Sequence, residues 1–253
     1  MVNTFSKEQI EKLENSYLEE FYHFLKYAQS RMLEGFQTGK KIKEDWISKW
    51  QSGTDAKGIS SFDRGAERII YALFNAQGFG QPNSSPIGSD LMFETKDAFI
   101  HIDLKTVQTR NIGDYSTCIF IGDNQNSYSG KIEVQGKSPR NYEAALPPIY
   151  KNSGDPKLCL TYFITILYEE KTLNILNINI LSMPNGLLND EYGSAVLKAG
   201  KNPGKIRFNF SRVDKFKLLD KKPKRIKVVY FNESMDKQLL KKLDYIHSIY
   251  KAQ

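Results

Sequence analysis

Two aspartates and a lysine stand at spacings that allow metal-dependent chemistry. Asp90 precedes the apolar run LMFE, and Asp103 and Lys105 lie two positions apart in a second apolar run, FIHIDLKT. If a hairpin turn falls at positions 96 and 97, residues whose numbers add up to 193 face each other across two strands. Asp90 then lies opposite Asp103, with Cβ atoms roughly 4.5–5.5 Å apart. Lys105 projects from the same face as Asp103, while Ile102 and Leu104 point into the core.

Two carboxylates directly opposite each other repel, so a sheet tolerates them only where something compensates their charge. A divalent cation does so, and an oxygen pair of this kind suits Mg²⁺, which keeps several waters and takes one or two carboxylates. The ammonium of Lys105 could then orient or deprotonate a metal-bound water and stabilise the extra charge on a pentacovalent phosphate. Phosphodiester hydrolysis needs these three things. The alternative is a surface hairpin in which Asp103 and Lys105 form a weak ion pair.

A glutamate and a turn support the hydrolytic interpretation. Residues 64–77 predict a helix that Ser61 or Asp63 could cap and Gly78 could end. Glu67 lies one turn into this helix and could reach towards the carboxylate pair, although an ordinary exposed glutamate is the alternative. The stretch QPNSSPIGSD would deliver Asp90 into its strand from a rigid turn. Donor-rich side chains suited to phosphates and base edges follow the lysine: Thr106, Gln108, Thr109, Arg110 and Asn111.

The hydrophobic pattern predicts the elements that would position these residues. Apolar residues at three- and four-residue steps predict further helices over 6–36, 42–50 and 235–250. Apolar and β-branched runs predict strands over 90–94, 99–107, 157–168, 173–181, 205–210 and 224–231. Loops rich in Asn, Ser and Gly connect them, and no repeat or low-complexity linker divides the chain. The pattern therefore favours one α/β domain with a mixed sheet, and it leaves the strand order open.

Composition bounds the class of protein. The chain has 253 residues, of which 40% are hydrophobic and 26% charged, as in ordinary globular proteins. It has no apolar stretch of the roughly 18 residues that a membrane span needs and no apolar signal segment, so we expect a cytoplasmic protein. Two cysteines without CxxC spacing exclude a disulfide framework, and three scattered histidines argue against a zinc site.

The net charge of +7 is concentrated in one segment. Residues 196–227 contain twelve Lys and Arg against two Asp, which gives +10 for this segment and about −3 for the remainder. A basic segment of this density suits a polyanion, most simply nucleic acid. A solvated lysine-rich face is the alternative.

Together, the helix with Glu67, the Asp90 that follows a Pro-containing turn and the DLK triplet at 103–105 resemble the PD-(D/E)XK nuclease core. The stretch IDLKTVQTRN is similar to the region around the catalytic lysine of type II restriction endonucleases such as EcoRV and HincII. The resemblance covers residues 60–111, about a fifth of the chain, and Ser89 stands where the motif has Pro.

This resemblance implies that Asp90 and Asp103 hold Mg²⁺, that Lys105 assists the attacking water and that Glu67 is an accessory acid. The fold would be a restriction-endonuclease-like α/β core, in which helices flank a mixed central β-sheet, with an N-terminal helical region. A single nuclease domain would span residues 1–253, with the helical region at 1–58 and the catalytic and DNA-recognition core at 59–253. A homodimer would match a palindromic site in double-stranded DNA. The N-terminal helices are candidates for its interface, unless they pack within the monomer.

By the same resemblance, sequence specificity would lie in two loops. In the first loop, 122–130, the amides that could pair with adenine are those of Asn124, Gln125 and Asn126. The second, 198–212, has glycines that permit close approach to DNA. Its polar side chains are Lys201, Asn202, Lys205 and Arg207. Plain turn chemistry is the alternative for both loops, since turns prefer Asn, Gly and Ser.

These observations predict a type II restriction endonuclease that hydrolyses double-stranded DNA at a specific short sequence with Mg²⁺. A DNA repair or recombination nuclease on the same core, which nicks mismatches or resolves junctions, is the alternative within enzymes. A non-catalytic DNA-binding protein is the alternative outside them. In a restriction-modification system, a cognate DNA methyltransferase would be the genetic partner, because the enzyme would otherwise cut the DNA of its host.

Overall fold

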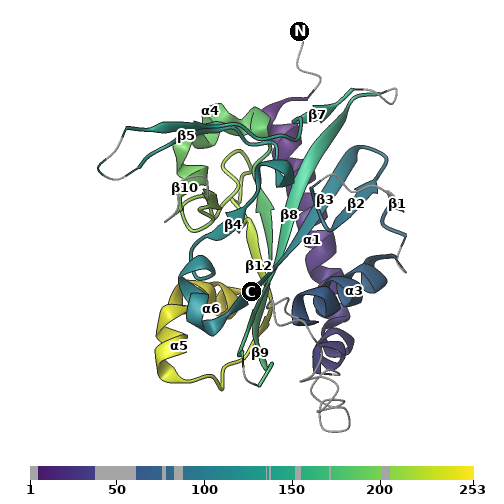
Figure 1. Cartoon of the computed structure of the whole chain (residues 1–253). Helices are drawn as coiled ribbons and strands as arrows, with labels where there is room; N and C mark the ends of the chain where they lie inside the picture. The colour runs from purple at the N-terminus through teal and green to yellow at the C-terminus, as the bar shows by residue number, and fades with distance from the viewer. Residues whose placement is uncertain are drawn as a thin grey trace.

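The computed structural model describes residues 5–37, 61–75, 78–82, 88–134, 136, 138–151, 155–170, 172–200 and 206–253. The strands of its central sheet are β1 (Gln81–Pro82), β2 (Leu91–Glu94), β3 (Ala98–Gln108), β7 (Ile149–Tyr150), β8 (Lys157–Tyr168), β9 (Ile175–Met183) and β12 (Ile226–Phe231). Their order is β1-β2-β3-β8-β9-β12, with β7 also paired to β8. The pair of long strands β3 and β8 is parallel and crosses the middle of the molecule (Figure 1), whereas the other pairs are antiparallel. The sheet is therefore mixed, as the sequence predicts.

The central strands form because their apolar residues point to both faces. In β8, every residue after Lys157 is buried, and β9 is buried throughout. Burial of this kind requires a covering layer on each face. On one face, the hydroxyl of Tyr162 donates to the carbonyl of Glu14 in α1 (Lys7–Tyr27) at 2.9 Å. On the other face, Phe163 packs against Phe208 of β11 (Ile206–Phe208), with ring centroids 6.4 Å apart.

The helical layer consists of α1 and α3 (Ser61–Asn75). A capping box starts α1, in which Ser6 Oγ accepts from the amide of Gln9 while Gln9 Oε1 accepts from the amide of Ser6. The apolar side of α1 packs inward, and its Phe21 and Phe24 contact Phe74 of α3 at centroid distances of 5.4 and 5.1 Å. This contact makes α1 part of the core of the monomer.

Smaller elements cover the other face. A three-stranded sheet has the order β10-β11-β4, with β10 at Leu197–Ala199 and β4 at Ile119–Ile121. β5 (Gly130–Ile132) and β6 (Arg140–Tyr142) form a ribbon that reaches away from the central sheet (Figure 1). The short helices are η1 (Thr109–Asp114), η2 (Asp123–Gln125), η3 (Gly186–Leu188), α4 (Asn189–Tyr192), η4 (Gly193–Val196), α5 (Lys237–Lys242) and α6 (Asp244–Ala252).

A buried ionic cluster ties α1 to the start of β12. Arg225, which is only 1% exposed, lies 2.8 Å from a carboxylate oxygen of Glu14 and 3.4 Å from one of Glu11. Its Nε also donates to the hydroxyl of Tyr192 at 3.1 Å. Unpaired charges of this kind would be costly in the interior, so the cluster fixes the position of α1 on the sheet.

This cluster corrects the interpretation of residues 196–227 as a single surface for a polyanion. Several of their basic side chains are used within the fold, where carboxylates neutralise them. The pairs are Arg207 with Asp114, Lys224 with Asp214, Arg225 with Glu11 and Glu14, and Lys227 with Glu19.

The helices differ from the predicted ones at their ends. The predicted helix over 6–36 is interrupted at Ala28, after which residues 29–37 are again helical. α3 spans Ser61–Asn75 and so includes three residues before the predicted start, which places Asp63 inside the helix and not at a cap. The predicted closing helix over 235–250 is broken into α5 and α6 at Leu243, whose φ of −102° and ψ of 13° are not helical. The predicted helix over 42–50 lies outside the described residues.

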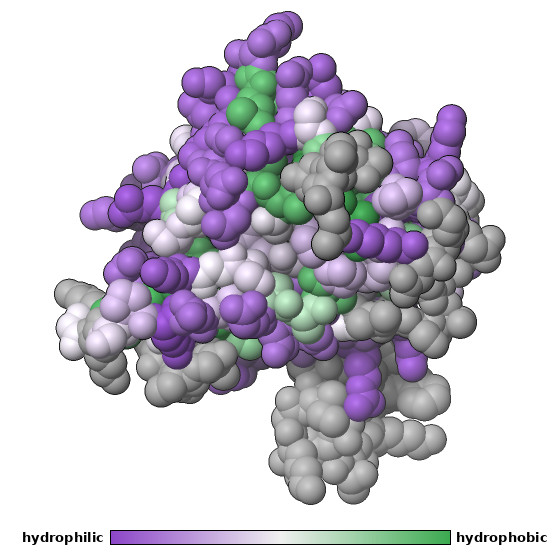
Figure 2. Space-filling view, turned by 90° about the horizontal axis from the view of Figure 1, so that it is seen from above, coloured by the Kyte–Doolittle hydropathy of each residue, from purple (hydrophilic) through white to green (hydrophobic). Residues whose placement is uncertain are grey.

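Polar residues dominate the surface seen in Figure 2, where hydrophobic residues show only as small separate areas of the described part. Within the described ranges, no helix is long and apolar enough to cross a membrane. Three large hydrophobic residues of the same ranges are exposed, namely Tyr27, Tyr71 and Phe120. Phe120 lines a cleft that Glu67 and Lys105 also line.

Candidate active site

The β2–β3 hairpin has the predicted register. Its turn is closed by a hydrogen bond from the amide of Thr95 to the carbonyl of Ala98 (2.8 Å) and by one from the amide of Ala98 to Thr95 Oγ1 (3.0 Å). The cross-strand partners run from Glu94 and Phe99 to Leu91 and Ile102, and the numbers of each pair add up to 193. Asp90 and Asp103 are the next positions along the two strands.

Asp90 is held at the entry of β2 by the backbone of β3. One of its carboxylate oxygens accepts a hydrogen bond of 2.6 Å from the amide of Leu104. The turn that precedes it contains Gly88 at φ +69°, where a Cβ atom would lie only 1.8 Å from the carbonyl oxygen of Asn124. Only glycine fits such an approach. Ser89, which replaces the Pro of the motif, lies with its Oγ 3.3 Å from Nδ1 of the buried His101.

Asp103 and Lys105 share a face of β3 and contact each other in an ion pair. Their side chains are only 5% and 15% exposed. Gln125 from η2 bridges them, because its Oε1 accepts from Lys105 Nζ at 2.9 Å and its Nε2 donates to Asp103 Oδ1 at 2.8 Å. The Lys105 ammonium also lies 5.8 Å from the ring centroid of Phe163 and 5.9 Å from that of Phe120. The structure therefore brings Asp103 and Lys105 together, as the sequence predicts.

The electrostatics of the site favour binding of a cation. Burial raises the pKa of Asp103 to about 7, although the nearby Lys105 counteracts this, and the charges of Asp90 and Glu67 raise the pKa further. Burial also raises the pKa of Asp90, against the effects of the Leu104 amide and of Lys105. For Glu67, burial and then the charge of Asp90 raise the pKa.

Asp90 and Asp103 are the side chains that could hold a metal ion. Oδ2 of Asp103 is buried, and apart from the ion-pair contact with Lys105 no hydrogen bond reaches it from the described part of the chain. In that part, no three or more His, Cys, Asp or Glu side chains converge as a metal site. A pair of carboxylates of this kind suits a hard cation that keeps several of its waters, as Mg²⁺ does.

A cleft of about 650 Å³ opens beside these residues. It runs between α3 and β4, which lie on either side of β3 (Figure 1). Its lining includes Asp63 and Glu67 from α3, Lys105 from β3, Asn111 from η1, Phe120 from β4 and Arg207 from β11. The predicted Glu67 thus faces the same cleft as Lys105.

The sequence predicts only a helix-capping role for Asp63, but in the structure Asp63 lines the cleft. Its carboxylate accepts a hydrogen bond from the hydroxyl of Thr106 on β3. Asp63 and Glu67 are four positions apart and therefore lie on one face of α3. This spacing was the available signal for a second acid at the cleft.

The predicted DNA-contacting residues after Lys105 spread over the end of β3 and η1. Gln108 donates to the hydroxyl of Tyr168 at 3.2 Å, which ties it to β8. Arg110 is exposed and lies 3.1 Å from the carboxylate of Glu170. Thr109 is partly exposed, and Asn111 is exposed and lines the cleft. The exposed members of this group, Arg110 and Asn111, are therefore both in η1.

The three amides of the first predicted recognition loop have different surroundings. Asn124 is exposed, whereas Gln125 is bonded to Asp103 and Lys105. Asn126 is fully buried: its Nδ2 donates to the carbonyl of Gly122 (3.0 Å) and to the hydroxyl of Tyr142 (2.8 Å). The prediction that Asn126 reads a base is wrong for this conformation, because its amide is already used to hold the loop.

Of the second predicted loop, Lys201, Asn202 and Lys205 lie outside the described residues. Arg207 is 9% exposed, and its Nε donates to Asp114 at 2.7 Å. It is paired with Lys198 on one side and with Phe120 on the other in the β10-β11-β4 sheet. Residues directly opposite in antiparallel strands share a face. Lys198, Arg207 and Phe120 therefore form a row that leads from the surface into the cleft, and we call it the cross-strand row.

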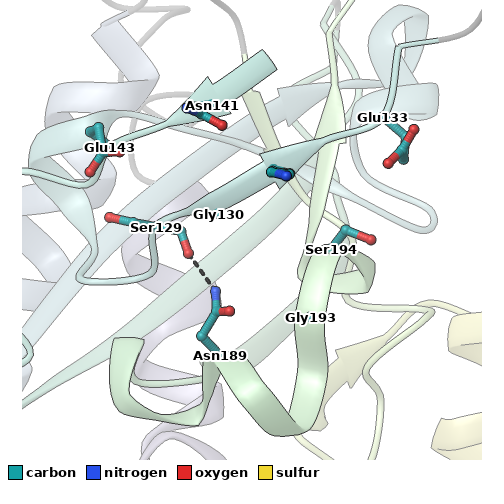
Figure 3. A pocket seen from close by; sticks show the side chains of 9 residues that line it. Ser129, Gly130, Glu133, Asn141, Glu143, Asn189, Gly193 and Ser194 are labelled. Carbon is teal, nitrogen blue, oxygen red and sulfur yellow. Dashed lines mark hydrogen bonds between the residues drawn. The ribbon is translucent and has the colours of Figure 1, made fainter. Parts of the chain in front are cut away.

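A second pocket, of about 570 Å³, lies between the β5–β6 ribbon and the segment of α4 and η4. In it, Asn189 donates to the carbonyl of Ser129 at 2.6 Å (Figure 3). Glu133 and Glu143 lie at opposite sides of this pocket in Figure 3. They do not form a carboxylate pair of the kind that Asp90 and Asp103 form, so the first cleft is the better candidate for the active site.

Known proteins resemble this chain in sequence and in fold. A family model described as the N-terminal domain of the type II restriction enzyme MwoI matches residues 7–172, and one described as its central domain matches residues 175–231. The boundary between the two matches falls between β8 and β9, which pair in the central sheet. No curated protein matched the chain.

Two solved structures share the fold. One is the restriction endonuclease BglI bound to its DNA recognition sequence, with a TM-score of 0.66 and 18% identity over 86% of this chain and 89% of that chain. The other is the tetrameric restriction endonuclease SfiI bound to cognate DNA, with a TM-score of 0.68 and 16% identity over 92% and 88%. They confirm the predicted restriction-endonuclease-like fold, with a mixed sheet flanked by helices.

Proposed function

The chain belongs to the family of the type II restriction enzyme MwoI, and on this premise we propose that its cleft hydrolyses double-stranded DNA with Mg²⁺ held by Asp90 and Asp103. It is a site-specific deoxyribonuclease. The alternatives of a repair nuclease and of a non-catalytic DNA-binding protein lose their support, because both family matches are to a restriction enzyme. The PD-(D/E)XK assignment of the active site, which the sequence predicts, stays part of this proposal. The finer likeness to EcoRV and HincII stays a prediction.

One observation carries the proposed chemistry, namely that two carboxylates and a lysine converge beside a cleft of about 650 Å³ that the lysine itself lines. Asp103 and Lys105 are in contact, and Asp90 adds its charge to theirs. An ion pair that served stability alone would be expected to have its oxygens satisfied by hydrogen bonds. Oδ2 of Asp103 contacts Lys105 Nζ but receives no further hydrogen bond from the described part of the chain, which supports a site prepared for a cation.

Mg²⁺ fits the donors because both are carboxylate oxygens and because it takes its remaining ligands from water and phosphate. When bound, it supplies a Lewis acid for the phosphate and lowers the pKa of a coordinated water. The chain supplies the rest. Lys105 would stabilise the charge that grows on the non-bridging oxygens as water adds to phosphorus and the opposite P–O bond breaks. Glu67, with its raised pKa, is placed to accept a proton at the α3 side of the cleft.

The DNA would lie along the cleft and the cross-strand row. Lys198 is exposed at the outer end of the row, and Arg207 stands between it and Phe120. Arg207 can pair with a phosphate in exchange for Asp114, and an aromatic ring at the cleft can pack against a sugar or base. We include the exposed Arg110, Asn111 and Asn124 among the contacts, with Thr109 and Gln108 nearby.

We propose a homodimer on a palindromic site, because two-fold protein symmetry then matches two-fold DNA symmetry. SfiI is described as tetrameric, so a tetramer is the competing assembly. Because α1 packs within the monomer, we expect the dimer interface on exposed surface outside α1. A cognate methyltransferase would protect the host DNA. Light scattering with and without DNA measures the assembly, and a monomer at saturating DNA would contradict the dimer.

Digestion of unmodified phage DNA tests the proposed function. With Mg²⁺ we expect discrete fragments, and with Ca²⁺ we expect binding without efficient cleavage, because the looser coordination of Ca²⁺ places the attacking water poorly. Asp90→Ala and Asp103→Ala should abolish cleavage while DNA binding persists. Asp220→Ala, at an exposed acid that does not line the cleft, serves as the control. Random degradation, or cleavage within tenfold of wild type in either site variant, would contradict the proposal.

A further inference from the structure

Gln125 makes three hydrogen bonds inside the candidate active site. Its Oε1 accepts from Lys105 Nζ (2.9 Å) and from the amide of Gly122 (2.7 Å). Its Nε2 donates to Asp103 Oδ1 (2.8 Å). The two groups that meet Oε1 are both donors, so the orientation of the amide is determined by its partners. One neutral side chain therefore joins the carboxylate to the ammonium.

The loop that carries Gln125 is anchored on two sides. On one side, the buried Asn126 bonds to Gly122 and Tyr142, and its Oδ1 accepts from the amide of Tyr128 at 2.9 Å. On the other side, Gly88 approaches the carbonyl of Asn124 so closely that a Cβ would not fit. Gln125 is thus held in place independently of its bonds to Asp103 and Lys105.

The sequence predicts that Gln125 reads a base, but in this arrangement its amide is not available to do so. Bidentate pairing with adenine needs both the oxygen and an N–H of the amide. Here Oε1 has two partners, and the carboxylate of Asp103 occupies one of the two N–H groups. The side chain would have to leave the active site before it could reach a base.

We propose that Gln125 is a positioning residue for hydrolysis, which keeps Lys105 beside the reaction centre when Asp103 turns its Oδ2 from Lys105 to the metal. This inference rests on the proposed function. Lys105 now contacts Oδ2 of Asp103, the oxygen that a metal ion would need. A lysine that loses this partner has a long flexible side chain and a strongly hydrated ammonium, which favour departure into water. The acceptor on Gln125 holds the ammonium in place, and its N–H keeps Asp103 oriented through the other oxygen.

Two substitutions of Gln125 test this role. Gln125→Met retains length and apolar volume but removes all three hydrogen bonds. Gln125→Glu retains acceptors for Lys105 and Gly122 but places a like charge against Asp103. The matched control is Asp123→Asn, an isosteric change at an exposed position of the same turn. Thermal unfolding in EDTA establishes that each variant is folded.

Single-turnover cleavage at saturating enzyme and DNA affinity in Ca²⁺ are measured for each protein. We expect the cleavage rate of Gln125→Met to fall about 10–100-fold, as for other side chains that orient metal ligands. The Ca²⁺ concentration that gives half-maximal DNA binding should rise about 10-fold, because Lys105 now competes for Asp103. DNA affinity at saturating Ca²⁺ and the recognised sequence should stay unchanged. Gln125→Glu should also lose rate, whereas Asp123→Asn should not.

The other results each overturn the inference. A cleavage rate of Gln125→Met or Gln125→Glu within threefold of wild type would show that the hydrogen bonds do not position the reacting groups. Weaker DNA binding at saturating Ca²⁺, or a relaxed recognition sequence, together with a wild-type cleavage rate would indicate that Gln125 reads a base. Failure of the wild-type protein to cut any DNA would be a failure of the proposed function itself, and it is seen before any variant is compared.

Discussion

The surroundings of Lys105 restrict its side chain. Its Nζ contacts Asp103 and Gln125 and lies between the rings of Phe120 and Phe163. A lysine on a surface strand would keep much of its rotational freedom, whereas this one is held within reach of the carboxylates. Such preorganisation is worth most in the transition state, where the protein dipoles need no further movement.

Lys105→Ala should therefore reduce the single-turnover rate by about 10²–10⁴-fold. Lys105→Arg should not restore it, because a planar and permanently charged fork cannot replace the compact ammonium. DNA affinity measured in Ca²⁺ should change much less than the rate. A rate near that of wild type for Lys105→Ala would leave Asp103 and Lys105 as a structural ion pair, whose loss is worth about 0–1 kcal/mol when exposed.

Asp103 should destabilise the metal-free protein at neutral pH. Its pKa is about 7 in the folded state against an ordinary 3.8, so the folded state holds this proton more tightly than the unfolded state does. The stabilising effect is fully present below pH 3.8 and is lost as the pH rises through about 7. Relative to wild type, the free energy of unfolding of Asp103→Asn should therefore rise by about 1–3 kcal/mol between pH 4.5 and pH 8. The loss of the ion pair with Lys105 offsets part of this gain. Urea denaturation in EDTA at the two pH values measures this, and equal differences at both would contradict the raised pKa.

At the scale of elements, the turn before β2 determines where Asp90 stands. Gly88 allows the turn to pass within contact of the η2 loop, and Asp90 then meets the amide of Leu104 on β3. The same contact places the loop of Gln125 over the hairpin. Two loops about 35 positions apart in the chain thus build one site.

Gly88→Ala should displace this turn, because the new Cβ would collide with the carbonyl of Asn124. A displacement of about 1 Å can cost about 10²-fold in rate. Gly136→Ala is the control, since Gly136 has the same backbone conformation (φ +70°) but open space around its Cβ position. Each variant carries about 1–3 kcal/mol of backbone strain. Equal cleavage rates for the two would show that the close approach does not position Asp90.

The small β10-β11-β4 sheet provides the cross-strand row. Lys198→Ala should weaken DNA binding, and the loss of one phosphate contact should reduce the slope of log affinity against log salt by about 0.9. Lys221→Ala is the control, because Lys221 is exposed in the same basic segment but does not line the cleft. Fluorescence anisotropy with labelled duplex at several salt concentrations measures both. An unchanged slope for Lys198→Ala would exclude this lysine from the interface.

At the scale of the whole molecule, buried ion pairs connect α1 to the start of β12. Glu11 and Glu14 of α1 meet Arg225, which precedes β12, more than two hundred positions later. Burial raises the pKa of Glu14, and Arg225 partly offsets this. A charged cluster in the core contributes little net stability, but loss of one member leaves the others uncompensated.

Arg225→Met should destabilise the fold by about 3–5 kcal/mol at pH 8. The loss should be smaller at pH 5, because the pKa of Glu14, raised further without Arg225, lets this carboxyl take up a proton and shed its charge. Chemical denaturation at both pH values measures the difference. Lys221→Met is the control and should stay within about 0.5 kcal/mol of wild type. A loss that does not depend on pH would point to packing of the arginine and not to its charge.

The sequence alone determined the hairpin and its register. The turn at 96 and 97 and the sum of 193 follow from side chains that alternate with a period of two and from a connection of only two residues. The spacing of Asp90, Asp103 and Lys105 and the position of Glu67 on a helix are local properties of this kind. Long apolar strands such as β8 were likewise predictable, because continuous apolar runs have few other stable uses.

Only the tertiary structure decided which polar residues belong to the site. Gln125 and Asn126 are adjacent amides in one turn, yet one lies between Asp103 and Lys105 and the other holds the loop from inside. The basic residues 207 and 225 looked alike in sequence, but one lines the cleft and the other is buried against α1. An amide or a guanidinium has the same hydrogen-bonding groups in water and in the core. Its role is therefore set by partners that only the packing of distant segments brings within reach.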